Sequence, residues 1–361
     1  MTDARTILNT PELFDRLRLY RTQGIGIKTV ERLFDRFKTI DKILQSNLKE
    51  WSSIESIKAE LMEAERNDYF YFFNHMSDFP LNELDITNVI MCAGDKKLLK
   101  RPLISIVGSR EASYHSLQFT KTISRELREI GYGIVSGLAR GIDSSAHTGA
   151  GADNTIAILS GGIDMPWPPE NRSLYEEIKN KGLIISDMPL GVSPSSYYFV
   201  KRNRLIASIS KTTIIVESRE NSGSIHTAMF ANEYKKLLLA CPSFPNDDRN
   251  YGNNRLLLDG IAKPIYSISH LKSYLTGSRE DGGRETVVKK LDKSAPKFSV
   301  DVLNLISSIP TSRSNLYEEF NRSITLRGEK CGISEYDIIL SWLELYDYIK
   351  IIGDGVIRIT D

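Results

Sequence analysis

The sequence contains few cysteines and no long apolar run. Only Cys92, Cys241 and Cys331 occur in 361 residues, far apart and without a CxxC spacing. This odd, scattered set favours reduced thiols in the cytoplasm and argues against a disulfide framework or a zinc site. No apolar stretch approaches the roughly 20 residues that span a bilayer. The charged start, Met1–Arg5, is not followed by an apolar core, so we expect neither a secretion signal nor a membrane span.

An excess of charge of either sign is also missing. The formal net charge is +1, with 41% hydrophobic and 26% charged residues, which is typical of a soluble globular protein. A neutral total can still contain a basic cleft, so contact with nucleic acid has to be argued from local clusters. The length predicts two or three domains.

Signatures of cofactor binding and of catalysis are absent. The sequence has neither GxGxxG followed by an acidic residue nor GxxxxGK[ST], so we expect no NAD, no ATP and no other cofactor. His115, His147 and His226 belong to no triad signature, and no HExxH or paired-cysteine spacing suggests a metal. We therefore expect a protein that is not an enzyme, in which His147 is a packed or capping residue.

The central part of the chain alternates between apolar strands and helices. The predicted strands are Leu103–Val107, Gly133–Ser136, Thr155–Leu159, Leu183–Ser186, Thr213–Glu217 and Leu237–Cys241. The predicted helices are Ser116–Ile130, Arg140–Ala150, Glu170–Lys179, Asn203–Ser210 and Ser224–Tyr234. Strands that are apolar throughout, separated by helices, predict an α/β fold with a Rossmann-like parallel sheet.

The loops after these strands are rich in Gly, Ser, Thr, Arg and Asp. In order they read GSRE, SGLARGID, SGGIDMPWP, SDMP and ESRENSGSIHTA. In the first loop Gly108 permits close approach to the backbone, Ser109 offers a hydroxyl and Arg110 presents a planar guanidinium that matches phosphate oxygens. Since the carboxyl ends of parallel strands share one edge of a sheet, we expect these loops to form one anion site.

The segment Phe199–Ala207 is the strongest basic cluster. Lys201, Arg202 and Arg204 stand near the predicted start of a helix, with Asn203 as its predicted cap and three aromatic residues just before. Charge for the backbone and rings for the bases are what single-stranded nucleic acid requires. Alternatively, the aromatic residues anchor the helix on the sheet.

Both ends of the chain are predicted to form separate helical domains. Near the amino terminus, Gly24-Ile25-Gly26 joins two amphipathic helices, and such a hairpin either binds a phosphate through its N–H groups or serves only packing. The pattern continues as helix over Leu44–Tyr71, and the aromatic run Tyr69–Phe73 suits a core better than a stacking platform. The basic run Lys96–Arg101 is either a solvated face or a border of the crevice.

Beyond the glycine- and charge-rich segment Gly277–Lys297, we predict three helices and a hairpin. The helices are Val302–Ile309, Asn315–Asn321 and Tyr336–Leu345, and the hairpin covers Tyr348–Ile359. This order is typical of a winged-helix module. The third helix carries acidic but no basic residues, so we favour a protein-binding or regulatory role over DNA contact. The predicted domains are 1–80 (helical), 81–276 (Rossmann-like), 277–297 (linker) and 298–361 (winged-helix-like).

The loop motifs together resemble the DNA-processing protein A family, also called DprA or Smf. They are IVGSR (Ile106–Arg110), SGLARGID (Ser136–Asp143), SGGID (Ser160–Asp164), FxxRNRLIA (Phe199–Ala207) and SGSxxTA (Ser222–Ala228). The resemblance covers about Leu103 to Gly260. It implies a cytoplasmic bacterial protein that dimerises, binds incoming single-stranded DNA in natural transformation, loads the RecA recombinase and displaces single-strand-binding protein.

The resemblance also implies the residues of the DNA site. They are Gly108, Ser109, Arg110, Ser136, Gly137, Arg140, Gly161, Gly162, Phe199, Lys201, Arg202, Asn203, Arg204, Ser222, Gly223, Ser224 and Thr227. This chain departs from the family pattern at Trp167-Pro168, Asp187 and Pro242-Ser243, which puts details of the rim in doubt. The rival interpretation is a nucleotide-binding or nucleotide N-glycosidic hydrolase-like Rossmann protein using Arg110 and Glu217, although its PGGxGTxxE loop is replaced here by SGSIHTA.

Overall fold

The computed structural model describes residues 2–46, 48–81, 86–244, 246–276, 294–306, 311–346 and 348–358. The chain divides into two compact units, Met1–Arg279 and Glu280–Asp361. The predicted linker, 277–297, lies mostly outside the described residues. The individual domain boundaries stay predictions.

The first unit is a ten-stranded sheet with helices. Its strands are β1 (Thr2–Asp3), β2 (Phe70–Phe73), β3 (Val89–Gly94), β4 (Leu103–Val107), β5 (Gly133–Ser136), β6 (Thr155–Ile158), β7 (Leu183–Ser186), β8 (Thr212–Ile215), β9 (Leu237–Ala240) and β10 (Lys263–Pro264). Its helices are α1 (Ala4–Asn9), α2 (Pro11–Arg21), α3 (Ile27–Phe37), α4 (Ile40–Gln45), α5 (Ile54–Arg66), α6 (Tyr114–Glu129), α7 (Ile142–Ala150), α8 (Arg172–Lys181), α9 (Ser196–Ile209), α10 (Gly223–Glu233), α11 (Tyr251–Leu258) and α12 (Ile268–Thr276). Short 3₁₀ turns are η1 (Lys96–Lys100), η2 (Ala152–Asn154), η3 (Pro169–Asn171) and η4 (Asp248–Asn250).

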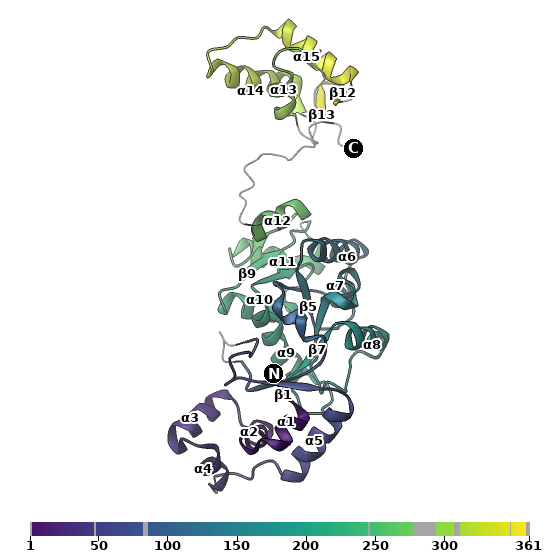
Figure 1. Cartoon of the computed structure of the whole chain (residues 1–361). Helices are drawn as coiled ribbons and strands as arrows, with labels where there is room; N and C mark the ends of the chain where they lie inside the picture. Colours follow the sequence, from purple (N-terminus) through teal and green to yellow (C-terminus); the bar gives the residue numbers. More distant parts are fainter. Residues whose placement is uncertain are drawn as a thin grey trace. The chain divides into compact units, whose positions relative to one another are not determined.

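The central strands are buried on both faces, which explains their continuous apolar sequence. Every residue of β4, β5, β6 and β7 is buried. Along β4, Ile104 and Ile106 pack on one face against α6 and α7, whereas Leu103 and Val107 pack on the other face with α9 and α10. Figure 1 shows these two helical layers on either side of the sheet. The predicted α/β fold with a Rossmann-like parallel sheet is confirmed.

The strand order places a topological switch beside β4. The order is β1-β2-β3-β7-β6-β5-β4-β8-β9-β10, with parallel pairing from β7 to β10. After β4, strands β5, β6 and β7 are added in turn on one side of β4. The next strand, β8, pairs with β4 on its other side. Loops that leave β4 and β8 therefore diverge to opposite sides. A ligand crevice forms at such a point in an open parallel sheet.

Three antiparallel strands extend the sheet at the β7 edge. The prediction of helix through Tyr71 is wrong, because α5 ends at Arg66 and the aromatic run enters β2, paired with β3. Asp68 has a φ of 56° and the N–H of Tyr69 donates to the carbonyl of Ala64, an arrangement that ends the helix. Aromatic residues then suit a pleated, buried strand. The prediction that this run belongs to the core is confirmed, since Tyr69–Phe73 is buried.

Helix α9 also differs from its prediction, because it begins seven residues earlier than Asn203. Ser195 is the N-cap and its hydroxyl accepts from the N–H of Tyr198 at 3.5 Å. The aromatic residues Tyr197, Tyr198 and Phe199 are consequently in the first turn of α9 rather than before it. Asn203 is not a cap; its side-chain amide donates to the carbonyl of Gly223 at 3.0 Å.

A buried ion pair joins the amino-terminal helices to the sheet. The guanidinium of Arg21, at the end of α2, contacts Glu60 of α5 at 2.8 Å, and the two side chains are only 5% and 8% exposed. Glu60 also accepts from the Tyr71 hydroxyl at 3.2 Å. A third bond runs from Nη1 of Arg21 to the carbonyl of Asp187, just after β7, at 3.1 Å.

The second unit contains three helices and a small antiparallel sheet. Its elements are α13 (Ser299–Leu305), β11 (Thr311–Ser312), α14 (Arg313–Thr325), α15 (Ile333–Leu345), β12 (Ile349–Ile352) and β13 (Gly355–Arg358), with sheet order β11-β13-β12. Phe320, Tyr336 and Ile339 lie at the centre of its core. The predicted order of three helices and a hairpin is confirmed. The ends of the predicted segments at 307–309 and 359 lie outside the described residues.

We expect Glu60→Gln to destabilise the first unit by about 3–5 kcal/mol, because it leaves the buried Arg21 guanidinium without a counter-charge. Urea unfolding monitored by circular dichroism measures the loss. The matched control is Glu63→Gln, since Glu63 pairs with Arg66 at the surface, where the side chains are 50% and 70% exposed. That control should change stability by less than about 1 kcal/mol. Equal effects of the two substitutions would contradict the assigned importance of the buried pair.

Candidate nucleic-acid interface

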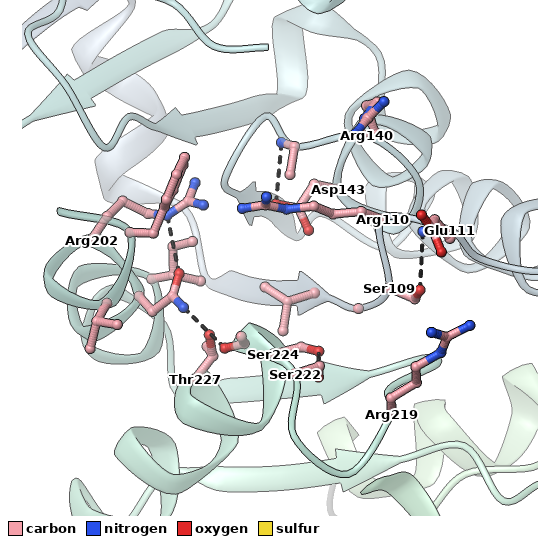
Figure 2. A pocket seen from close by; sticks show the side chains of 18 residues that line it. Ser109, Arg110, Glu111, Arg140, Asp143, Arg202, Arg219, Ser222, Ser224 and Thr227 are labelled. Carbon is pink, nitrogen blue, oxygen red and sulfur yellow. Dashed lines mark hydrogen bonds between the residues drawn. The ribbon is translucent and has the colours of Figure 1, made fainter. Parts of the chain in front are cut away.

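A pocket opens at the switch point, between the loops that follow β4, β5 and β8. It has a volume of about 500 Å³ and includes the start of α9 and α10 in its wall. Its charged lining residues in the described chain are Arg110, Glu111, Arg140, Asp143, Arg202 and Arg219. Figure 2 shows the guanidinium of Arg110 extending across this pocket toward the side where Arg202 lies.

Backbone hydrogen bonds fix the GSR loop against its neighbours. The N–H of Ser109 donates to the carbonyl of Glu217 at 2.7 Å, and the carbonyl of Ser109 accepts from the N–H of Ile142 at 3.1 Å. Gly141 has a φ of 77°, and a Cβ at that position would collide with the carbonyl of Ser109. Glycine is therefore required where the loop after β5 passes the loop after β4. The two loops form one rigid wall.

The carboxylate of Glu217 is committed to this framework. Glu217 is fully buried and accepts from the N–H of Ser113 at 3.1 Å and from the Ser113 hydroxyl at 2.7 Å. Ser113 is the N-cap of α6, so these bonds attach the start of that helix to the end of β8. Glu217 is not among the residues that line the pocket. The rival hydrolase interpretation required this carboxylate to face a substrate.

Arg110 is held over an aromatic ring. Its guanidinium carbon lies 4.8 Å from the centroid of Phe199, in the first turn of α9. A cation over a ring face is attracted by the ring quadrupole, and the contact restricts a long, exposed side chain. Phe199 thus positions the cation, which occupies one face of the ring.

Hydroxyl and amide groups gather at the start of α10. The hydroxyls of Ser218, Ser222 and Ser224 lie within 2.5–2.9 Å of one another. Ser222 is the N-cap of α10 but makes no side-chain cap bond; the N–H of Ile225 donates to the Ser222 carbonyl, and those of Gly223 and Ser224 remain available at the pocket wall within the described residues. A helix amino terminus combined with hydroxyl donors favours an anion.

Arg202 is part of the frame rather than an exposed cation. It is 5% exposed, and its Nη1 donates to the carbonyl of Ile158 at 2.9 Å and to that of Gly137. A Cβ at Gly137 would collide with this guanidinium, so the glycine makes room for it. Burial, against the opposing field of Asp143, lowers the pKa of Arg202 to about 10, so it stays charged at neutral pH. Arg202 also lines the pocket, so its positive charge acts on an anion there even though the guanidinium is bonded to backbone carbonyls.

Asp143 and His147, both on α7, hold the loop after β5. Oδ2 of Asp143 accepts from the N–H of Gly137 at 3.1 Å, and burial raises the pKa of this carboxyl. Leu138 has a φ of 59°, and its N–H donates to Nε2 of His147 at 3.3 Å. Nδ1 of His147 donates to the hydroxyl of Thr155, which itself donates to a carbonyl. Burial lowers the pKa of His147 to about 3, and the neutral ring stabilises the strained turn. The interpretation of His147 as a packed residue is confirmed.

The structure brings most of the predicted site residues together. Those that line the pocket are Gly108, Ser109, Arg110, Arg140, Phe199, Arg202, Asn203, Ser222, Gly223, Ser224 and Thr227. Gly137 lines an adjoining cavity of about 280 Å³ that shares Arg110 and Arg140 and contains the 49% exposed Trp167.

The remaining predicted residues lie elsewhere. Ser136 is buried and donates to the carbonyl of Ile106 at 2.7 Å, whereas Gly161 and Gly162 pack under the chain at Pro189–Pro194. Lys201 and Arg204 line a third cavity on another side of α9.

Sequence reasoning missed Arg219 as a lining residue and the framework roles of Asp143 and Glu217. Arg219 stands in the ESRENSGS loop directly after β8, and its position after a strand was an available signal. The carboxylate of Glu217 gave no such signal, because its bonds run to Ser113, which is distant in sequence, whereas Asp143 bonds to the nearby N–H groups of Gly137 and Ala139.

The fold and pocket define an α/β protein with a crevice lined by arginine, serine and glycine residues at the switch point of a parallel sheet. The model of the DNA recombination-mediator protein A family matches residues 71–276. The chain belongs to this family, DprA/Smf, as its loop motifs predicted. Among the residues that the structure describes, none of the helices has both the length and the apolar character for crossing a membrane.

Related proteins carry the same assignment. The chain is 39% identical over 176 residues to protein Smf of Synechocystis, which covers 48% of this chain and 44% of that protein. It is 34% identical over 182 residues to the DNA processing protein DprA of Bacillus subtilis, covering 50% and 61%. The match thus spans about half the length of these curated relatives.

Two solved structures share the fold. One, on the single-stranded DNA binding mode of DNA processing protein A from Helicobacter pylori, is 32% identical with a TM-score of 0.54, covering 58% of this chain and 96% of that one. The other, DprA from Streptococcus pneumoniae, is 25% identical with a TM-score of 0.61, covering 72% and 97%.

The buried, neutral His147 should make stability fall in acid. The unfolded chain binds a proton near the ordinary pKa of about 6.5, whereas folded His147 does so only near 3, so the unfolded state holds more protons between these values. We expect the stability advantage of the wild type over His147→Gln to shrink by about 2 kcal/mol between pH 7 and pH 5.

Urea unfolding at several pH values measures this difference, and Asp143 contributes equally to both proteins. The matched control is His115→Gln, since His115 is exposed at the start of α6. Its curve should run parallel to that of the wild type. Parallel curves for His147→Gln as well would contradict the assigned role.

Proposed function

We propose that this protein binds single-stranded DNA at the switch-point pocket and mediates recombination without catalysing a reaction. The observation that carries the proposal is the convergence of the GSR loop, Arg140, Arg219 and the start of α10 on one pocket. Guanidinium groups, backbone N–H groups and hydroxyls are the donors that recognise phosphate oxygens without reading a base sequence. The family assignment and the DNA-binding mode described for the H. pylori relative support it.

The pocket suits a strand with exposed bases better than a duplex. Its volume of about 500 Å³ admits a small number of nucleotides. The exposed Trp167 at the adjoining cavity offers a ring face on which a base can stack. Stacking contributes about 1–3 kcal/mol per base and tolerates any sequence.

The wider role that we propose follows from the family. A homodimer of this protein would receive incoming DNA in natural transformation, protect it, displace single-strand-binding protein and load the RecA recombinase. The burial of Glu217 against Ser113 disfavours the rival hydrolase function, because the carboxylate is fully buried, bonded to Ser113 and not part of the pocket lining.

Arg110→Ala should weaken binding of a poly-dT oligonucleotide by about 10- to 100-fold, because it removes a charge-assisted phosphate contact worth about 1.5–3 kcal/mol. Fluorescence anisotropy over a salt series measures the affinity for single and double strands. Arg125→Ala is the matched control, since Arg125 is exposed on α6 and lines none of these cavities. Unchanged binding by Arg110→Ala would show that the pocket is not the DNA site.

The mediator role has its own test. On single strands already coated with single-strand-binding protein, we expect the wild type to restore RecA filament formation and strand exchange, and Arg110→Ala to restore neither. Strand exchange assays with and without the coat measure this directly. Normal DNA binding without any stimulation of RecA would contradict the mediator role while leaving the binding function in place.

A further inference from the structure

A second basic groove lies on the other side of α9, between that helix and the amino-terminal hairpin. It has a volume of about 890 Å³ and lies within the first compact unit. One wall is the Thr22–Thr29 segment that joins α2 to α3, and the opposite wall carries Tyr197, Tyr198, Lys201 and Arg204 of α9. None of these residues lines the switch-point pocket.

Most of the charged residues that line the groove are basic, and two of them have no ion-pair partner among the described residues. Among its described lining residues, Arg21, Lys28, Lys201 and Arg204 are basic and Asp187 alone is acidic. Arg21 is neutralised by Glu60, and Lys201 pairs with Asp187 at 2.8 Å. In the described part of the chain, the Lys28 and Arg204 side chains form no ion pair or hydrogen bond, although Arg204 is half-buried. A phosphate in the groove would supply the counter-charge that Arg204 lacks among the described residues.

The hairpin adds donors along the same wall. Gly26 is the N-cap of α3, and a Cβ there would meet nothing within 4 Å, so its backbone is open to close approach. Within the described residues, the N–H groups of Ile27 and Lys28 have no hydrogen-bonded acceptor. They stand at the positive end of an 11-residue helix, beside the ammonium of Lys28.

The opposite wall offers aromatic faces. Tyr197 is 74% exposed and Tyr198 lies edge-on to it, with ring centroids 5.5 Å apart. Aromatic rings and cations on α9, facing N–H groups on the hairpin, form a site for a phosphate backbone that carries unpaired bases.

We infer that this groove binds the continuation of the single strand held in the switch-point pocket. The strand passes over the amino-terminal turn of α9, which separates the two sites, and Lys28 and Arg204 hold phosphates beyond it. Asp187 keeps Lys201 in place on the wall. The inference rests on the proposed function, because it needs the first site to hold the same strand.

The test uses the full chain and fluorescent poly-dT oligonucleotides of increasing length. The double variant Lys28→Ala/Arg204→Ala should bind the shortest oligonucleotides as the wild type does and bind long ones about tenfold or more weakly, because both side chains make charge-assisted bonds to phosphate. The slope of log affinity against log salt for long oligonucleotides should fall by about 1.4, or 0.7 for each phosphate that is no longer neutralised. The matched control is Lys58→Ala/Arg125→Ala, at exposed positions outside all three cavities.

The outcomes separate the two claims. Failure of Arg110→Ala to weaken any length would overturn the proposed function. Loss of binding by Arg110→Ala, with long oligonucleotides held equally by the wild type and the double variant, would overturn the groove alone. A loss that is the same at every length would also overturn it, since Lys28 and Arg204 would then belong to the first site. Photo-crosslinking of iodouracil-substituted strands to Tyr197, identified by mass spectrometry, would support the groove directly.

Discussion

The placement of β8 beside β4 is the constraint on which the pocket depends. The chain leaves β4 toward β5 and later leaves β8 toward β9, so the carboxyl ends of these two neighbours have no connection running across them. The bond from the N–H of Ser109 to the carbonyl of Glu217 joins the two loops at this point, together with the bonds from Ser113 to the Glu217 carboxylate. Every lining group that we assign to phosphate reaches the crevice because the loops part here.

Buried polar side chains hold the loop after β5 at the pocket, because their hydrogen bonds fix the direction of its backbone groups. Arg202, Asp143 and His147 are all nearly fully buried, and each bonds to the backbone of the loop at Gly137–Ala139. Removing any one of them would leave a buried carbonyl, N–H or charge without its partner, which is costly in a low dielectric. The exposed Arg140 is consequently carried by a loop whose preceding residues are held by buried hydrogen bonds.

The sequence was sufficient to predict the parallel sheet, because fully buried strands such as Leu103–Val107 have an apolar residue at almost every position. It could not predict which side of β4 receives β8, since that choice depends on packing between segments a hundred residues apart. Strand β2 was missed because Phe70–Phe73 follows α5 after only three residues, so its apolar side chains extend the pattern of the helix. The Gly, Ser and Arg residues of the pocket loops could be predicted from the sequence, because each loop directly follows a predicted strand and its residue types alone suggest contact with phosphate. The carboxylate of Glu217 entered only the rival interpretation, as a group that faces a substrate, and nothing local in the sequence indicated its buried bonds to Ser113.

The basic cluster of α9 shows how one misplaced boundary changes a functional interpretation. With the helix begun at Asn203, Lys201, Arg202 and Arg204 form one group in an extended approach. With the helix begun at Ser196, the period of 3.6 residues separates them. Phe199, Arg202, Asn203 and Ile206 then lie on the stripe that faces the pocket, whereas Tyr197, Lys201 and Arg204 lie on another that faces the groove. Because α9 begins after its N-cap Ser195, the residues predicted to form one site lie on two different faces of the helix. A strand that occupies both surfaces would have to cross α9.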